Sequence, residues 1–198
     1  GDLVDSKSIQ DRFSFQERLT ETLQSVGEHS TASPYTLTLG DEFQALYTDA
    51  KDIFADLLEV RAAIYPVRCR FSLAIGEITT PINRQQAIGM DGPAFHYARG
   101  MIEQLRQSGD QLSIIGLPLA IESLFAPAIN LLWASTESWN ANRLRILCRE
   151  LQNPDASMKR YGLAVSERAI YKNIREARLH DWVQLIRAAE MHLNQLLK

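Results

Sequence analysis

The segment that most constrains the architecture is Tyr35-Thr36-Leu37-Thr38-Leu39-Gly40-Asp41-Glu42-Phe43-Gln44-Ala45-Leu46-Tyr47. Residues 35–39 alternate between apolar and polar side chains and are rich in β-forming types, which predicts a strand. Residues 40–42 interrupt this pattern as a tight turn, because glycine and aspartate are the residue types that turns favour. Residues 43–47 then return as a second strand. The segment therefore predicts a β-hairpin with an acidic turn.

Helical and extended patterns alternate on both sides of this hairpin. Apolar residues at helical spacing cover 9–26, 49–65 and 93–107, and extended segments cover 67–77 and 112–115. Pro66 ends the second helix and Pro93 begins the third, where proline suits the first turn. Residues 1–5 have the pattern of a strand end that runs into a loop, so we expect a truncated first strand. The order β-α-β-β-α-β-α-β predicts an α/β sandwich with helices packed on a sheet.

The second half of the chain differs in pattern and in charge. We expect helices over 117–125, 126–135, 139–151, 157–162, 167–178 and 179–197. Residues 1–139 carry 10 Lys/Arg and 18 Asp/Glu, whereas residues 140–198 carry 11 and 6. This difference in charge indicates that the two parts of the chain have different functions. We predict an α/β domain over 1–116, a helical connector over 117–138 and an all-α domain over 139–198.

Composition narrows the compartment and the class of protein. Hydrophobic residues make up 45% of the 198 residues, which is enough for a core. Cys69 and Cys148 stand far apart without a partner pattern, so we expect two buried free thiols in a reducing compartment. The most apolar stretch, residues 114–133, contains Glu122 and two prolines, which argues against a membrane span. With no secretory signal visible, the sequence predicts a cytoplasmic protein without a membrane partner.

Two acidic turns predict a cation site. Asp2 lies in the first turn, and Asp41 and Glu42 lie in the hairpin turn. If the truncated first strand lies beside residues 35–39, Asp2 and Asp41 come together, and two such carboxylates repel unless a cation lies between them. Oxygen ligands favour Mg²⁺ or Mn²⁺ shared with phosphate, and the carbonyl of Leu3 could add a ligand. The alternative is that both segments are ordinary turns.

Three further charged residues are candidates for nucleotide contacts. Lys7 follows the first turn, Glu77 ends the extended segment 67–77, and Arg99 lies on the helix that begins at Pro93. A cation or an acid at such positions can pair with a phosphate or a ligand group. Each also has a simpler interpretation as a solvated surface charge.

Residues 156–178 predict a helix-turn-helix. Ser166 is a good N-cap, and Ile170 and Ile174 would be buried between the helices. The side chains left exposed are Arg168, Tyr171, Lys172 and Arg175. Such a helix can enter the DNA major groove, with Arg and Asn reaching base edges and Lys the phosphates. The alternative is a packing module for another protein. The apolar stripe of residues 179–197 is either core or the seam of a homodimer.

Three motifs occur in the order found in class III nucleotide cyclases. They are Gly1-Asp2-Leu3-Val4-Asp5, Leu39-Gly40-Asp41-Glu42-Phe43 and Phe71-Ser72-Leu73-Ala74-Ile75-Gly76-Glu77. The hairpin also resembles the signature of diguanylate cyclases. The resemblance implies a ferredoxin-like, cyclase-like sandwich in which Asp2 and Asp41 hold metal ions. The run 89–99 is similar to the cyclase helix that carries a transition-state Asn and Arg, the latter matching Arg99.

The resemblance to nucleotide cyclases does not extend to two positions that catalysis and base recognition need. The cyclase Asn falls on Phe95 and the base-recognising residue falls on Leu37. An apolar side chain neither hydrogen-bonds a base edge nor stabilises developing charge. The resemblance therefore implies metal or nucleotide binding more strongly than cyclase turnover.

The whole chain resembles the SatD family of bacterial proteins, which is linked to acid tolerance. The motifs that carry this resemblance are residues 1–6, 40–44, 76–78 and 87–94, with Trp139 and residues 166–174 in the tail. Together, the resemblance and the residues imply a DNA-binding regulatory protein whose cyclase-like domain binds a divalent metal, a nucleotide or both. A metal-dependent nucleotidyl enzyme and a non-catalytic interaction module are the alternatives.

Overall fold

The computed structural model describes residues 1–152, 163 and 165–197, and they fall into two compact units. Unit 1 comprises Gly1–Thr48 and Val67–Ser138, and unit 2 comprises Asp49–Pro66 and Trp139–Lys198. Residues 49–66, which the sequence placed within the α/β domain, thus group with the C-terminal helices. The two units group residues that contact one another in space, and they do not show which segments fold independently. The predicted domain boundaries near 116 and 139 therefore stay a prediction.

Unit 1 is built on a five-stranded sheet of order β2-β3-β1-β4-β5. Its strands are β1 (Asp2–Leu3), β2 (Ser33–Leu39), β3 (Glu42–Leu46), β4 (Cys69–Ala74) and β5 (Leu112–Ile115). The pairs β2–β3, β3–β1 and β1–β4 are antiparallel, and β5 is parallel to β4. The predicted hairpin is confirmed. The first strand, however, lies beside the returning strand β3 and not beside residues 35–39.

The two faces of this sheet differ in polarity because side chains alternate along a strand. Leu3, Phe43 and Phe71 are buried, and the rings of Phe43 and Phe71 meet edge to face at 6.0 Å. The alternate positions are polar: Asp2, Glu42, Gln44, Arg70 and Ser72. One face therefore supplies the core, and the other carries charged and amide groups.

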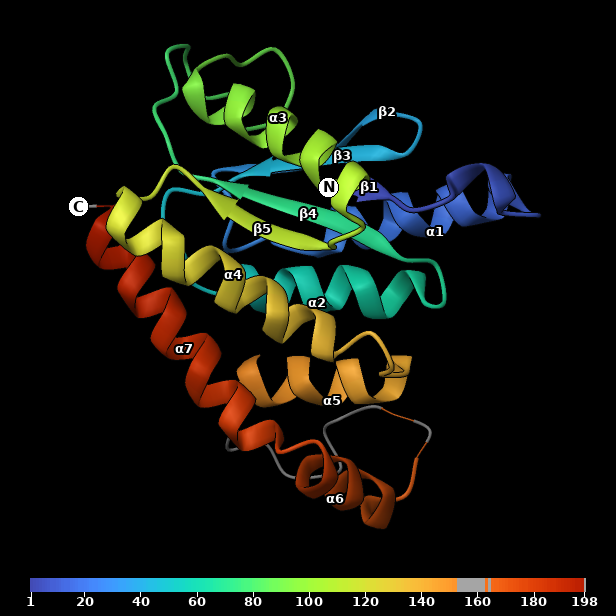
Figure 1. Cartoon of the computed structure of the whole chain (residues 1–198). Helices are drawn as coiled ribbons and strands as arrows, with labels where there is room; N and C mark the ends of the chain where they lie inside the picture. Colours follow the sequence, from blue (N-terminus) through green and yellow to red (C-terminus); the bar gives the residue numbers. More distant parts are fainter. Residues whose placement is uncertain (153–162, 164, 198) are drawn as a thin grey trace. The chain divides into compact units, whose positions relative to one another are not determined.

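The helices of unit 1 are α1 (Arg12–Ser25), α3 (Pro93–Ser108) and α4 (Leu119–Ser135). Figure 1 shows α3 above the sheet and α4 below it. Trp133 of α4 meets Phe71 at 5.8 Å, so α4 covers the apolar face. Arg106 of α3 bonds to Asp2, so α3 lies over the polar face. The expected break between residues 125 and 126 is wrong, because α4 is one continuous helix that contains Pro127. A proline removes one backbone hydrogen-bond donor from a helix and need not end it.

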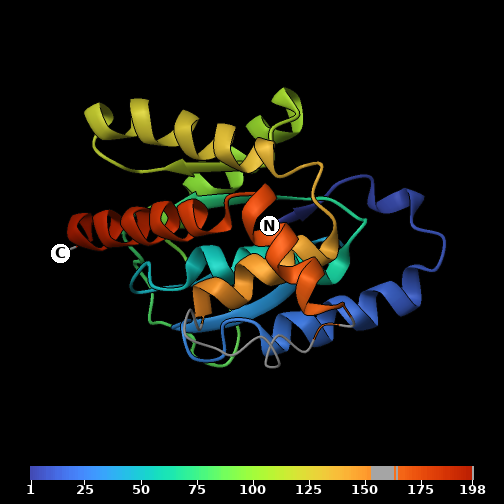
Figure 2. The same ribbon diagram turned by 90° about the horizontal axis from the view of Figure 1, so that it is seen from below.

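Unit 2 consists of α2 (Ile53–Ile64), α5 (Ala141–Gln152), α6 (Glu167–Glu176) and α7 (Leu179–Leu196), with α5 packed along α2 (Figure 2). Trp139 and Trp182 meet edge to face at 5.3 Å. The N-terminus of α2 is capped from α7, where Glu190 accepts from the Phe54 amide at 3.4 Å. The predicted helix over 157–162 lies outside the described residues.

Both thiols belong to these cores. Cys69 is buried on β4 and Cys148 is buried on α5, and neither is part of a disulfide. Burial raises the pKa of the Cys148 thiol above its usual range, because the thiolate would lose its hydration. The prediction that both cysteines are small core residues is therefore confirmed.

Candidate functional site

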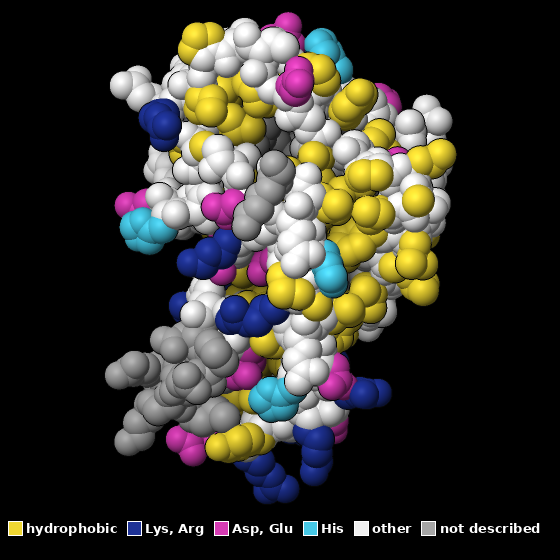
Figure 3. Space-filling model, turned by 90° about the vertical axis from the view of Figure 1, so that its left-hand side faces the viewer, with side chains coloured by type: hydrophobic (Ala, Val, Ile, Leu, Met, Phe, Trp, Pro, Cys, Tyr) yellow, Lys and Arg dark blue, Asp and Glu magenta, His cyan; other side chains and the backbone are white. Residues whose placement is uncertain are grey.

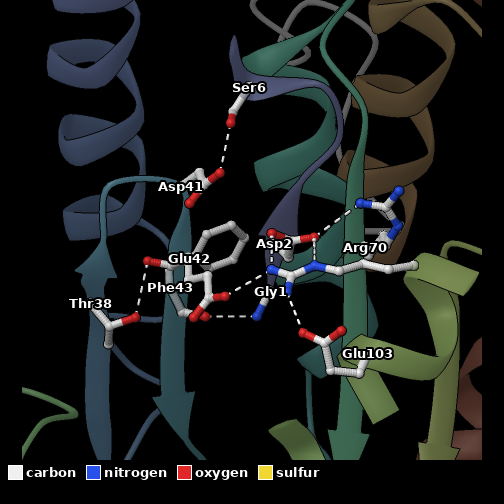
Figure 4. A network of polar contacts seen from close by, with 10 residues as sticks. Gly1, Asp2, Ser6, Thr38, Asp41, Glu42, Phe43, Arg70 and Glu103 are labelled. Atoms are coloured by element: carbon white, nitrogen blue, oxygen red, sulfur yellow. Dashed lines mark hydrogen bonds and ion pairs between the residues drawn. The ribbon is translucent and has the colours of Figure 1, made fainter. Parts of the chain in front are cut away.

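A network of ion pairs occupies the polar face of the sheet where β1 lies between β3 and β4 (Figure 4). At its centre is Asp2, which is only 2% exposed. The register places Asp2 opposite Glu42 on β3 and opposite Arg70 on β4. The pleat therefore brings an acid and a base from the two neighbouring strands to the same buried carboxylate.

Both oxygens of Asp2 are bonded to arginine. Arg70 donates to Oδ2 through Nη1 at 3.0 Å. Arg106 donates to Oδ2 through Nε at 3.1 Å and to Oδ1 through Nη2 at 2.8 Å. This two-pronged contact is the strong form of a carboxylate–guanidinium pair, and it stabilises the charge of a buried acid.

Arg106 also joins Asp2 to two other acids. Its Nη2 donates to Glu42 Oε1 at 2.8 Å, and its Nη1 donates to Glu103 Oε1 at 2.5 Å. The hydrogen bonds to Asp2 and Glu42 raise the pKa of Arg106 further above its usual range. One guanidinium thus bridges carboxylates from β1, β3 and α3.

Asp41 takes a different partner. Its Oδ2 accepts from the Ser6 hydroxyl at 2.6 Å, and its backbone carbonyl accepts from the Leu3 amide at 3.0 Å. In Figure 4 the Asp41 side chain points to Ser6 while Asp2 points to Arg70. Of the two hairpin acids, the one that shares a cationic partner with Asp2 is therefore Glu42, the residue after Asp41. The assignment of Asp41 and the Leu3 carbonyl as metal ligands stays a prediction.

Lys7, Glu77 and Arg99 lie apart from this network. All three are exposed, and within the described part of the chain none has a hydrogen bond or ion pair to the network. Lys7 lies on a 3₁₀ turn over Ser6–Ser8, and Glu77 lies in the loop after β4. Their role toward a nucleotide stays a prediction.

Sequence reasoning missed the two arginines that dominate the site. Arg70 could have been found from the alternation of strand β4, because Phe71 beside it is the core residue. Arg106 lies seven residues after Arg99, two helical turns along the same side of α3, and it reaches the site that was expected for Arg99. Local spacing alone could not choose between these two positions.

The acids do not by themselves make a closed metal centre. Among the described residues, no group of three or more His, Cys, Asp or Glu side chains is arranged to hold a metal ion. Asp2 and Glu42 nevertheless converge on a single atom, Nη2 of Arg106, at 2.8 Å each. The pair has the oxygen chemistry that Mg²⁺ and Mn²⁺ prefer, and Arg106 stands where such a cation would bind.

The second candidate surface is helix α6 of unit 2. Ile170 and Ile174 are buried, as predicted, and the Ser166 hydroxyl caps the helix by accepting from the Ala169 amide at 3.3 Å. The outward-facing side chains include Arg168, Tyr171, Lys172 and Arg175, and the acids Glu167 and Glu176 at the two ends of the helix are exposed as well. Lys172 lies 3.9 Å from Glu176 one turn on, an exposed pair that costs little to open.

Asn173 of this helix is not free to reach a base, which corrects one sequence expectation. Its Oδ1 accepts from Arg143 Nε at 2.9 Å, and its Nδ2 donates to the Ala169 carbonyl at 2.8 Å. The guanidinium of Arg143 also lies 5.7 Å from the ring of Trp139. Asn173 therefore fixes α6 against α5, and the exposed cations are left as the groups available to a partner.

The fold and the site define a two-unit protein: an α/β unit with a buried carboxylate–arginine network, and a helical unit with a basic surface helix. The sequence profile of the SatD family matches residues 1–152, well over half of the chain, and the protein therefore belongs to the SatD family. The match ends before α6 and α7. No curated protein and no solved structure matches the chain. No helix among the described residues is long and apolar enough to cross a membrane.

Proposed function

We propose that this SatD family member is a DNA-binding regulatory protein in which α6 contacts DNA and the polar sheet face of unit 1 binds a divalent cation with a nucleotide. The observation that carries the proposal is the division of α6 into a buried apolar stripe and an exposed basic face. Ile170 and Ile174 hold the helix in unit 2, and the cations beside them are left to solvent. This is the division that a helix needs to lie in a major groove.

The distribution of charge supports the DNA half of the proposal. Unit 2 carries 13 Lys/Arg and 10 Asp/Glu, whereas unit 1 carries 8 and 14. A positive unit on a negative protein directs a polyanion to one surface. The sequence before α6 is Leu163-Ala164-Val165-Ser166, which resembles the turn sequence of bacterial helix-turn-helix regulators.

The test is salt-dependent DNA binding. Fluorescence anisotropy with a labelled duplex pool should give an affinity that falls with salt. The double variant Arg168→Ala/Lys172→Ala should flatten the slope by about 0.9 for each phosphate that is no longer neutralised. Lys51→Ala is the matched control, because Lys51 is an exposed cation of the same unit far from α6 in sequence. Unchanged affinity and slope in the double variant would refute the assignment of α6.

A specific observation favours a cation and nucleotide site in unit 1. Asp2 and Glu42 come from neighbouring strands and face one cationic atom, an arrangement that places two oxygen ligands together. The strand order β2-β3-β1-β4, with its β-α-β-β-α-β connections, agrees with a ferredoxin-like sandwich, the core that cyclase-like domains resemble. A cation bound between these acids would displace Arg106 and leave its guanidinium available for a phosphate.

This half is tested independently of DNA. Addition of Mn²⁺ or Mg²⁺, alone and then with each common nucleoside triphosphate, should raise the thermal unfolding temperature of the whole chain. Asp2→Asn should abolish the shift, Arg106→Gln should strengthen binding of Mn²⁺ alone, and Arg99→Gln, an exposed position on the same helix, should leave Mn²⁺ binding unchanged. No shift with any combination would refute the cation site and leave the DNA proposal standing.

The enzymatic alternative makes a separate prediction. A metal-dependent nucleotidyl enzyme would release pyrophosphate from a nucleoside triphosphate and lose that activity in Asp41→Asn. Phe95 in the first turn of α3 stands at the position of the cyclase Asn, and Leu37 on β2 stands at that of the base-recognising residue. Neither side chain supplies a polar group. A chain that binds neither metal, nucleotide nor DNA would be a non-catalytic interaction module.

A further inference from the structure

The outward face of α4 is apolar along its whole length. Leu119, Leu124 and Leu131 are 82%, 75% and 74% exposed. Leu124 and Leu131 are seven residues apart and therefore lie on the same side of the helix. The largest apolar patch on the surface of a protein is often functional. Figure 3 shows hydrophobic side chains gathered at the right-hand side of the view, where α4 lies. This face of α4 is therefore a candidate interaction surface.

Five of the exposed residues of α4 follow a coiled-coil period. Their order along the helix is Ala120, Leu124, Pro127, Leu131 and Ala134, all of them exposed. The spacing is four, three, four and three, which is the a/d pattern of a helix that packs against another helix. Ile129 and Trp133, on the opposite side, are already buried within unit 1. The stripe is therefore a second packing face, separate from the one that holds α4 in place.

This stripe is also symmetric in side-chain size. From either end it runs small, large, proline, large, small, with its centre at Pro127. In an antiparallel pair about a two-fold axis, Leu124 of one copy would meet Leu131 of the other, and the alanines would let the helix ends approach closely. A face that is complementary to itself fits a second copy of the same chain.

Charge supports the same occupant. Glu122 is the one charged residue in α4, and its Oε2 accepts from the Gly116 and Leu117 amides at 2.7 and 3.0 Å, so it is directed back to the preceding turn. No like charges would meet across the axis. The helix contains no Lys or Arg, the residues that hold an amphipathic helix on an anionic bilayer. A lipid surface is therefore disfavoured as the partner.

We propose that the protein forms a homodimer through an antiparallel α4–α4 contact centred on Pro127. The sequence pointed to residues 179–197 as the candidate seam. The buried positions of α7, however, include Ile186, Ala189 and Leu193, which pack within unit 2. A two-fold dimer would place two copies of α6 in one assembly, as a palindromic DNA site requires.

The experiment is analytical ultracentrifugation of the full chain. The wild-type chain should sediment as a dimer at micromolar concentration, and Leu131→Glu should sediment as a monomer. Phe13→Glu is the matched control, because Phe13 of α1 is 72% exposed and lies outside the stripe; this variant should remain a dimer. Circular dichroism of both variants should match the wild type, since exposed positions are changed.

Cysteine cross-linking tests the orientation. The double variant Leu124→Cys/Leu131→Cys should give a disulfide-linked dimer on mild oxidation, and Leu131→Cys alone should not, because the two copies of residue 131 lie about 10 Å apart along the axis in an antiparallel pair. A monomeric wild type would overturn the proposal. So would a dimer that persists in Leu131→Glu, or lipid-vesicle binding that this substitution abolishes.

Discussion

Glu190 offers the sharpest quantitative test of unit 2. This residue lies on α7, is 9% exposed, and its carboxylate accepts from the Phe54 amide in the first turn of α2. Burial raises the pKa of Glu190 from 4.5 to about 7, and the negative charge of Asp52 adds to this effect, whereas the Phe54 amide and Arg187 oppose it. The folded protein therefore holds a proton on Glu190 at a pH where the unfolded chain has released it.

The sign of the pH dependence follows from this difference. Between pH 4.5 and about 7 the native state binds more protons than the unfolded state, so the free energy of unfolding falls as pH rises. The favourable contribution is complete below pH 4.5 and lost above about 7. A shift of this size corresponds to at most about 3 kcal/mol, and partial access of solvent to the carboxyl reduces this to roughly 2 kcal/mol.

The substitution Glu190→Gln removes the titration and keeps an oxygen that can accept from the Phe54 amide. Urea unfolding followed by circular dichroism should show near-equal stability of variant and wild type at pH 5, with the variant more stable by roughly 2 kcal/mol at pH 8. Glu176 is an exposed acid of the same unit, and Glu176→Gln should leave the difference in the free energy of unfolding between pH 5 and pH 8 as it is in the wild type. A Glu190→Gln curve parallel to that of the wild type would refute the burial argument.

Three further substitutions test the packing of particular elements, each by thermal unfolding. Gly116→Ala should cost about 2 kcal/mol or more, because the backbone has φ +92° and an added Cβ would lie 2.0 Å from the Ile75 carbonyl oxygen; a wild-type melting temperature would contradict this. Trp133→Ala should destabilise by about 3–5 kcal/mol, since a buried ring against Phe71 leaves a large cavity. Ser166→Ala should cost about 1 kcal/mol through loss of the α6 cap, and Ser166→Asp should restore most of it.

Much of the fold could be predicted because it is encoded over short distances. The hairpin follows from alternation and one acidic turn, and β5 was predicted with the bounds that the structure has. Helix α3 begins at Pro93 and is capped after Ser108 by Gly109, and these are the residue types that favour a first turn and a C-terminal cap. The buried stripe of α6 follows from helical spacing. Each of these features depends on neighbours within a few residues.

The features that were missed depend on contacts between distant segments. β1 has two residues, too few for a pattern to show which strand it would join, and its pairing with β3 and β4 decides which side chains surround Asp2. The grouping of α2 with α5 likewise has no local signal, since both helices have ordinary apolar patterns. Pro127 misled the prediction in the opposite way, because a local breaker was overridden by continuous packing of α4.

Arg70 and Arg106 explain why the sequence could identify the acids but not the positive group that balances their charge. A sequence shows that Asp2 and the hairpin acids are candidates, and two nearby carboxylates require positive charge. It does not show whether that charge is a metal ion or a guanidinium. The structure places Arg106 on both Asp2 and Glu42, and the buried acid is balanced without any ligand. Any cation must then exchange with Arg106, so the affinity for a divalent ion should depend on residue 106 as strongly as on the acids themselves.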